Sequence, residues 1–138
     1  LTGVFSCVQA EIAQMVQQET GGSIVNTASI CGLVALPHAT AYNAAKHGVI
    51  GLTKSAAVEY GPKKIRVNAV CPGFIDTPML AKGAGASQEI LNGVVSQLPI
   101  RRIAGASEVA DVVAWLLSEQ SSYVTGVAMP IDGGWTAQ

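Results

Sequence analysis

Three residues whose types and spacing suit carbonyl chemistry follow one another closely: Ser29, then Tyr42 thirteen positions later, then Lys46 four positions after that. If the chain is helical from residue 41 onward, Tyr42 and Lys46 lie one turn apart on the same face, because positions i and i+4 are neighbours on a helix. An ammonium beside a phenol favours the phenolate and lowers the pKa of a phenol from about 10 toward neutrality. Such a phenol can exchange a proton with a carbinol or carbonyl oxygen. A Ser hydroxyl from the preceding strand could hydrogen-bond the same oxygen and stabilise charge that develops there.

A Tyr–Lys pair at this spacing also occurs on ordinary solvated helix faces, where it does no chemistry. Two neighbouring features favour a site here: Ser29 follows a strand-like run, SIVNTAS, and Tyr42 opens a helix rich in small residues. This order brings a hydroxyl at a strand end close to a phenol at a helix start. We therefore interpret Ser29, Tyr42 and Lys46 as candidate catalytic residues for the interconversion of an alcohol and a carbonyl compound.

The elements that must position these residues are visible in the apolar pattern. Apolar residues at three- and four-residue intervals predict a helix over residues 2–18, which Gly21 and Gly22 end. The other predicted elements are a strand at 23–28, a helix at 41–60, a strand at 65–70, a helix at 107–118 capped by Ser107, and a last strand at 126–132. Strands that alternate with helices imply parallel pairing through right-handed crossovers, so the sequence predicts an α/β fold.

Two segments lie where such a fold binds ligands. The loop CPGFIDTPM follows the strand at 65–70, and ligands bind at the carboxyl ends of strands in open α/β sheets. Residues 76–98 carry a weak helical periodicity that glycines interrupt. They could form a lid over a substrate or an irregular surface connection.

Composition argues against several classes of partner. Apolar residues make up 49% of the chain and charged residues 12%, a balance typical of buried parallel strands flanked by helices. The net charge of −1 leaves no basic footprint, so we expect no nucleic-acid partner. The sequence contains no apolar run of about 18 residues, so we expect no membrane partner.

The cysteines and the first fifteen residues indicate the cellular compartment. Cys7, Cys31 and Cys71 are widely spaced and match no metal pattern, so we interpret them as free buried thiols. Free thiols are typical of the reducing cytoplasm. The first fifteen residues lack a basic region and carry Glu11, which makes them a poor signal peptide. The sequence predicts a cytoplasmic protein.

The stretch that contains Ser29, Tyr42 and Lys46 resembles the active-site region of the short-chain dehydrogenase/reductase family. Four segments agree with the family in order: GGSIVNTASICG resembles the strand that ends in the active-site Ser, AYNAAKHGV the catalytic helix, VNAVCPGFIDT the nicotinamide loop, and TGVAMPIDGGW the final strand. The resemblance covers nearly the whole chain and implies a doubly wound parallel-sheet (Rossmann) fold. It also implies an NAD(P)-dependent oxidoreductase that interconverts a secondary alcohol and a ketone by hydride transfer.

The same resemblance implies cofactor contacts. The residues it assigns are Tyr42, Lys46, Pro72, Gly73, Ile75 and Thr77. Lys46 would hydrogen-bond the nicotinamide ribose, and Pro72 and Gly73 would pack near the ring. The Ile75 backbone would bind the carboxamide, and Thr77 would contact the carboxamide or the diphosphate.

One part of the family pattern is absent from the sequence: a first strand, glycine-rich turn and helix that would hold the pyrophosphate. The opening LTGVF resembles the start of the helix that follows the family's active-site Asn. We therefore expect residues 1–138 to be a single partial domain, the catalytic and substrate half of a longer reductase. The residue that distinguishes NAD from NADP would lie in the other half, so either cofactor fits. The strand at 23–28 would then expose an unpaired apolar edge.

Two functions of different class follow. One is an enzyme that acts on a small-molecule alcohol or ketone, with Tyr42 as the acid/base. The other is a truncated non-catalytic fragment that acts only as an oligomerisation module. Helices 2–18 and 41–60 resemble those through which the family forms dimers, so we expect a homodimer or homotetramer.

Five other residues carry minor expectations. His47 is predicted to be structural, and His38 to lie in an exposed loop or to line a substrate pocket. Asn68 and Asp132 are predicted to form hydrogen bonds at strand ends. Trp135 is predicted to pack at a subunit contact or over the site.

Overall fold

The centre of the structure is β2 (Ile65–Pro72), the middle strand of a parallel three-stranded sheet. β1 (Gly22–Thr27) pairs with it on one side and β3 (Ala128–Ile131) on the other. Ile65 and Val67 are fully buried, as expected for β-branched residues in a strand that helices cover on both faces. In this computed structural model, which describes residues 1–18, 20–83 and 87–138, β1 pairs with β2 alone, so its other edge is open.

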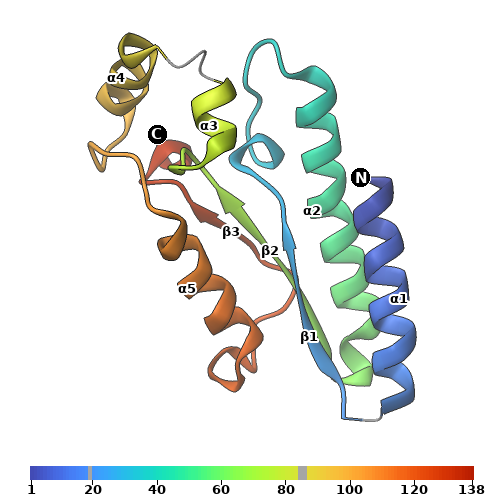
Figure 1. Cartoon of the computed structure of the whole chain (residues 1–138). Helices are drawn as coiled ribbons and strands as arrows, with labels where there is room; N and C mark the ends of the chain where they lie inside the picture. Colours follow the sequence, from blue (N-terminus) through green and yellow to red (C-terminus); the bar gives the residue numbers. More distant parts are fainter. Residues whose placement is uncertain (19, 84–86) are drawn as a thin grey trace.

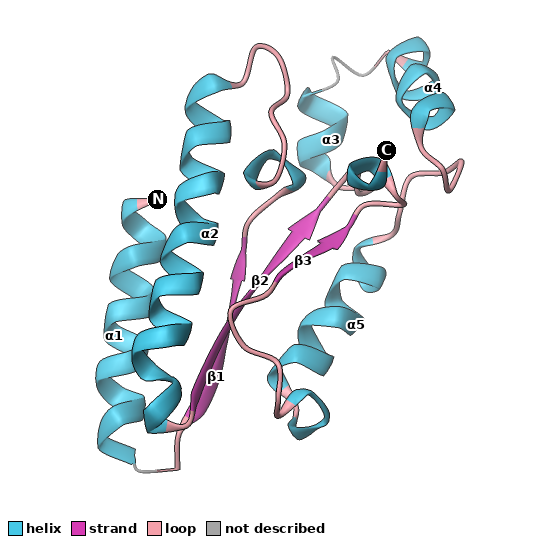
Figure 2. Cartoon of the chain, turned by 180° about the vertical axis from the view of Figure 1, so that it is seen from behind, coloured by secondary structure: helices cyan, strands magenta, loops and turns pink. Residues whose placement is uncertain are grey.

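Helices cover both faces of this sheet (Figures 1 and 2). α1 (Thr2–Gln18) and α2 (Thr40–Tyr60) lie side by side on one face, and α5 (Ala106–Leu117) covers the other. Buried side chains from α1, α2, β1 and β2 form one continuous core: Val8, Ile12, Ile24, Ala56, Ala57, Ile65 and Val67. The arrangement is part of a doubly wound α/β fold, as the alternation of strands and helices predicted.

The start of α5 differs from the prediction. The helix begins at Ala106 with Gly105 as its N-cap, so the assignment of Ser107 as the cap was wrong. The Glu108 carboxylate accepts a hydrogen bond of 2.9 Å from the Gly105 N–H and two of 2.7 and 2.8 Å from the Arg102 guanidinium. Hydrogen bonds from Arg102 and then from Gly105 lower the pKa of Glu108 to about 2. A carboxylate three positions into the helix therefore satisfies the backbone at this end, in place of a Ser hydroxyl.

Residues 76–98 contain two short helices rather than an irregular connection. α3 (Pro78–Gly83) follows the loop after β2, and α4 (Gln88–Gln97) follows α3. Residues 84–86 of the proposed lid lie outside the described residues.

The cysteines are free, but they are not all buried. Cys31 and Cys71 are buried, whereas Cys7 is exposed, so the prediction of a buried thiol was wrong for Cys7. The reason is helix phase: the adjacent Val8 turns toward the sheet and is 3% exposed, which turns Cys7 outward. Within the described residues, no helix combines the length and apolarity that crossing a bilayer requires.

Arg66 joins β2 to the carboxyl end of α5. Its guanidinium donates hydrogen bonds to the carbonyl oxygens of Leu116 (2.9 Å), Ser118 (3.1 Å) and Val124 (3.2 Å). A cation is favourable at this end of a helix, where backbone carbonyls lack helical partners.

Arg66→Met is therefore expected to lower the free energy of unfolding by about 2–4 kcal/mol, since hydrogen bonds from a charged group are worth about 1.5–3 kcal/mol and burying an unpaired carbonyl adds a penalty. Chemical denaturation measures this loss. Lys63→Met, at an exposed lysine whose ammonium bonds to no described residue, is the control and should change stability by less than about 0.5 kcal/mol. Equal stability of the two variants would contradict the role of Arg66.

Candidate active site

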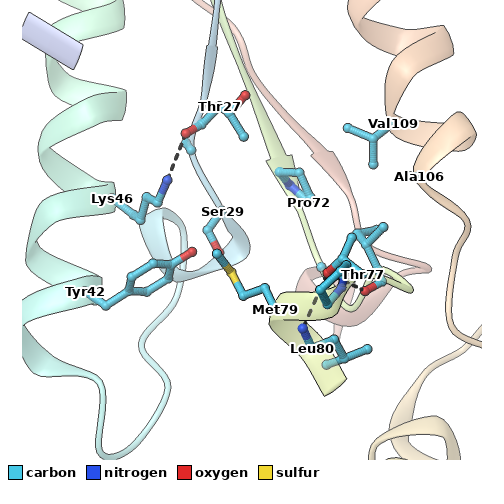
Figure 3. A pocket seen from close by; sticks show the side chains of 14 residues that line it. Thr27, Ser29, Tyr42, Lys46, Pro72, Thr77, Met79, Leu80, Ala106 and Val109 are labelled. Atoms are coloured by element: carbon cyan, nitrogen blue, oxygen red, sulfur yellow. Dashed lines mark hydrogen bonds between the residues drawn. The ribbon is translucent and has the colours of Figure 1, made fainter. Parts of the chain in front are cut away.

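A cavity of about 640 Å³ lies at the carboxyl ends of β1 and β2 (Figure 3). Its lining comes from the end of β1, the start of α2, the loop after β2, α3 and the start of α5. The lining residues are Thr27, Ala28, Ser29, Tyr42, Lys46, Pro72, Gly73, Ile75, Thr77, Pro78, Met79, Leu80, Ala106 and Val109. Every site residue that the sequence predicted is in this set.

Ser29 stands two residues after the end of β1 and is 8% exposed. It is the N-cap of a short 3-10 turn, η1 (Ile30–Gly32), and its Oγ accepts a 3.2 Å hydrogen bond from the Cys31 N–H. Because Oγ is the acceptor in that bond, its own proton is available for a ligand. Burial raises the pKa of the neighbouring Cys71 thiol, although a hydrogen bond from the Ser29 backbone opposes this, so Cys71 stays neutral beside Ser29.

Tyr42 and Lys46 lie on one face of the first turns of α2, as their spacing predicted. Lys46 Nζ is 5.5 Å from the centroid of the Tyr42 ring. Figure 3 shows the Tyr42 hydroxyl and the Ser29 side chain turned toward the same space. Tyr42 is 43% exposed, and its hydroxyl has no hydrogen-bond partner among the described residues. A phenol O–H and a Ser O–H thus face one cavity, and both are free to bond a third oxygen.

The ammonium of Lys46 has a partner that the sequence did not reveal. Lys46 Nζ donates a 2.9 Å hydrogen bond to the Thr27 carbonyl oxygen, at the end of β1 (Figure 3). This bond holds the long side chain across the cavity, beside Tyr42 and Ser29. Every residue has a backbone carbonyl, so the residue types gave no indication that Thr27 would accept this hydrogen bond. Only the packing of α2 against β1 shows it.

The residues assigned to the nicotinamide lie across the cavity from Tyr42, in the loop after β2. The backbones of Phe74 and Asp76 pair with Ala104, with hydrogen bonds of 3.2 and 2.8 Å. The N–H and C=O of Ile75 therefore point the other way, and among the described residues the Ile75 N–H has no partner. The Thr77 hydroxyl donates to the Ile75 carbonyl at 3.3 Å. A backbone donor and acceptor side by side in a cavity wall fit an amide group such as the nicotinamide carboxamide.

Gly73 in this loop is required by close packing. A Cβ built on Gly73 would lie 2.9 Å from both Cα and Cβ of Asp132, in the turn after β3. The Asp132 carboxylate accepts hydrogen bonds from the Gly134 N–H, the Thr136 N–H and the Thr136 hydroxyl, at 2.9, 2.9 and 2.6 Å. Partial burial alone would raise the pKa of Asp132, but hydrogen bonds from Thr136 and Gly134 outweigh it and hold that pKa below its usual range. The turn after β3 thus supports the loop from behind.

Asp132→Asn is expected to lower the free energy of unfolding near neutral pH by about 1–3 kcal/mol, because an amide cannot accept all three hydrogen bonds. A carboxyl whose pKa is depressed on folding stabilises the protein above its ordinary pKa, 3.8, and this stabilisation is lost as the pH falls below that value. The difference between wild type and variant should therefore shrink below about pH 4 in denaturation curves recorded across pH. Asp111→Asn, at an exposed Asp of α5, is the control; a difference that does not change with pH would contradict the argument.

The remaining wall of the cavity is apolar and was not predicted residue by residue. Met79 and Leu80 of α3 and Ala106 and Val109 of α5 supply it, and Figure 3 shows Met79 reaching toward Ser29. Among the described lining residues, Lys46 alone carries a charge. No sequence motif in α3 or α5 indicated that these helices line the cavity. Their approach to β1 and α2 depends on the sheet between them.

The residues with minor expectations fall mostly outside the cavity lining. His47 Nδ1 is 2.9 Å from the Asn43 carbonyl, a local helix contact, and His38 is exposed in its loop. Asn68 is fully buried, donates to the Val124 carbonyl at 2.9 Å and accepts from the Val127 N–H at 3.1 Å. It forms the expected hydrogen bonds, but it lies in the middle of β2, so its placement at a strand end was wrong.

Trp135 packs edge-on against Phe74 of the loop after β2, with ring centroids 5.1 Å apart. Within the described residues, no group of three or more His, Cys, Asp or Glu side chains could hold a metal ion.

Comparison with known proteins gives the class to which this fold and site belong. A family model described as enoyl-(acyl carrier protein) reductase matches residues 1–136. The A-factor type gamma-butyrolactone 1'-reductase of Streptomyces virginiae is 46% identical over 134 residues, which are 97% of this chain and 52% of that protein. Cyclohexanol dehydrogenase of an Acinetobacter species is 45% identical over 138 residues, 100% of this chain and 52% of that protein.

Solved structures agree. The crystal structure of levodione reductase superposes with a TM-score of 0.96 at 41% identity, over 99% of this chain and 55% of that one. 4-Hydroxyisoleucine dehydrogenase complexed with NADH gives a TM-score of 0.94 at 34% identity, over 100% of this chain and 56% of that one. The chain belongs to the short-chain dehydrogenase/reductase family. It spans about half the length of the curated relatives that it matches.

Proposed function

We propose that the whole protein is an NAD(P)-dependent oxidoreductase that interconverts a secondary alcohol and a ketone. One observation carries the proposal: the hydroxyls of Ser29 and Tyr42 face one cavity, with Lys46 beside the Tyr42 ring. A single substrate oxygen can accept a hydrogen bond from both hydroxyls. This geometry suits proton transfer at an oxygen whose charge changes during the reaction.

Each of the three residues has a role in this proposal. In the oxidation direction Tyr42, as the phenolate, takes the hydroxyl proton of the substrate, and in the reduction direction it returns a proton to the ketone oxygen. Ser29 donates a hydrogen bond to that oxygen and holds it in place. Lys46 places a positive charge beside the Tyr42 ring, and the Thr27 carbonyl keeps the ammonium in position.

The cofactor contacts of this chain concern the nicotinamide end. Ile75 would bind the carboxamide through its backbone, Thr77 would contact the carboxamide or the diphosphate, Lys46 would bind the ribose, and Pro72 and Gly73 would pack beside the ring. Hydride exchange is the chemistry that a bound nicotinamide supplies. NADH in the 4-hydroxyisoleucine dehydrogenase structure supports a cofactor of this kind.

The lining indicates the class of substrate. Met79, Leu80 and Val109 line the cavity that the catalytic hydroxyls enter, and the lining contains no described cation besides Lys46 to pair with an anionic substrate. We therefore propose an uncharged ring or alkyl compound as the substrate. The position of α3 over the cavity also supports a lid role for the described part of residues 76–98.

The test uses the full-length protein. Absorbance at 340 nm reports the reduction of NAD or NADP by neutral secondary alcohols such as cyclohexanol, and carboxylated analogues serve as the comparison. Turnover of neutral substrates with either cofactor is expected. Absence of turnover across the panel with both cofactors, in a folded protein, would overturn the proposal.

A second candidate, an oligomerisation module without catalysis, is favoured by exposed apolar residues on α1 and α2. Phe5 is 49% exposed, Val16 39% and Val58 82%. These faces also support a homodimer or homotetramer of the enzyme itself, and free cysteines support a cytoplasmic location. Titration of the 138-residue chain with NADH and NADPH separates the two candidates: tight binding would exclude a fragment with an incomplete cofactor site.

A further inference from the structure

Gly32 is a point of very close approach between the turn that carries Ser29 and the helix that carries Tyr42 and Lys46. A Cβ built on Gly32 would lie 2.7 Å from the Lys46 carbonyl oxygen and 2.7 Å from Ile50 Cδ1. Side chains essentially never come closer than 3.0 Å to such atoms. Gly32 does not have a positive φ, so the requirement here is one of space and not of backbone conformation.

Gly32 is coupled to Ser29 through the turn η1. The Gly32 N–H donates a 2.9 Å hydrogen bond to the Ser29 carbonyl, and the Cys31 N–H bonds to Ser29 Oγ. The turn closes with bonds of 2.8 and 2.9 Å from the N–H groups of Leu33 and Val34 to the Ile30 carbonyl. Because these bonds make the turn one small unit, a displacement at Gly32 moves Ser29 with it.

The helix on the other side of the contact is held more firmly than the turn. Val49 and Ile50 are buried against β1 and β2, and the Thr53 hydroxyl accepts a 3.0 Å hydrogen bond from Asn26 of β1. Thr53 is fully buried and donates in turn to the Val49 carbonyl. A side chain at position 32 would therefore displace η1 and leave α2 in place. Contacts shorter than 3.0 Å essentially never occur and ordinary contact begins at 3.4 Å, so relieving the 2.7 Å contact needs a displacement of about 0.3–0.7 Å.

We propose that Gly32 is a positioning residue that sets the separation between the Ser29 hydroxyl and the hydroxyl of Tyr42. The inference rests on the proposed function. Its action is through Ser29 alone, because Tyr42 and Lys46 stay with α2. Misplacing a catalytic group by about 1 Å can cost about 100-fold in rate.

The test is a double-mutant cycle in the full-length protein with its nicotinamide cofactor. Gly32→Ala should lower kcat by about 10- to 100-fold while the dissociation constant for the reduced cofactor, measured by fluorescence titration, stays within about two-fold. In a Ser29→Ala background the same substitution should cost less than about three-fold, because the group it misplaces is gone. Gly51→Ala is the matched control: Gly51 is also in α2, and a Cβ there meets nothing within 4 Å, so kcat should not change.

An equal loss from Gly32→Ala with and without Ser29 would overturn the inference, as would wild-type kcat in Gly32→Ala. If Gly32→Ala does not fold, Ile50→Val decides, because it loosens the same contact by removing Cδ1 and leaves the backbone unchanged. It should lower kcat about two- to ten-fold, and this loss should vanish in the Ser29→Ala background; a persistent loss or none would refute the role of this contact. An inactive wild-type protein would refute the proposed function itself. The double-mutant cycle distinguishes that result from a failure of the Gly32 inference, because the cycle compares variants of an active protein.

Discussion

Replacing Tyr42 by Phe is expected to lower kcat by about 100- to 10,000-fold, the range that a positioned acid or base contributes. The substitution removes one oxygen atom and leaves the ring beside Lys46 Nζ, so the shape of the cavity is kept. Because the Tyr42 hydroxyl has no partner among the described residues, its loss leaves no buried group unsatisfied and should not reduce stability. Steady-state rates at 340 nm, together with a titration of the reduced cofactor, measure the effect.

Tyr123→Phe is the matched control for this variant. Tyr123 is fully exposed and is not among the residues that line the candidate active site. Its kcat and stability should equal those of the wild type. A Tyr42→Phe protein with the turnover of the control would show that proton transfer does not depend on this phenol.

Replacing Lys46 by Met is expected to have the second-largest effect, a fall in kcat/KM of about 100-fold near neutral pH. Removal of the ammonium leaves the Thr27 carbonyl without its 2.9 Å hydrogen bond and takes away the positive charge beside the Tyr42 ring, which would stabilise negative charge that develops on the reacting oxygens during proton transfer. Cofactor binding should weaken as well, since Lys46 is proposed to bind the ribose.

Lys54→Met provides the comparison, because Lys54 lies on the same helix at an exposed position. It should leave both kcat/KM and the affinity for cofactor unchanged. If Lys46→Met kept the kcat/KM of the wild type, a role of the ammonium in proton transfer would be refuted. If the cofactor affinity were also unchanged, Lys46 would act on neither the proton nor the ribose.

Close spacing in the sequence was a good guide wherever the positioning is local. Tyr42 and Lys46 share a face because helical geometry alone relates residues four apart. The strands were predictable because the β-branched residues of β2 have few other stable environments than a buried strand. Helix phase within α1 could have corrected the prediction for Cys7, since the buried Val8 and Ile12 define the inner face.

The start of α5 was predicted wrongly although its cause is local: the Glu108 carboxylate, six residues after Arg102 and three after Gly105, bonds both and makes Gly105, not Ser107, the cap. Contacts between segments more distant in the chain were beyond such reasoning. The hydrogen bond from Lys46 to the Thr27 carbonyl depends on how α2 lies against β1. No pattern of residue types encodes a backbone acceptor.

The amino-acid sequence by itself determined the candidate reacting groups, the order of strands and helices, and the loop after β2 as a ligand-binding segment. These predictions follow from the periodicity and spacing of residue types, which reflect the backbone geometry of a few neighbouring residues. Only the tertiary structure decided that Ser29 meets Tyr42, that α3 and α5 close the cavity, and that Gly32 fits against Lys46 without room for a side chain. Those relations arise when a sheet brings separate segments together, and their distances are set by packing rather than by any local preference.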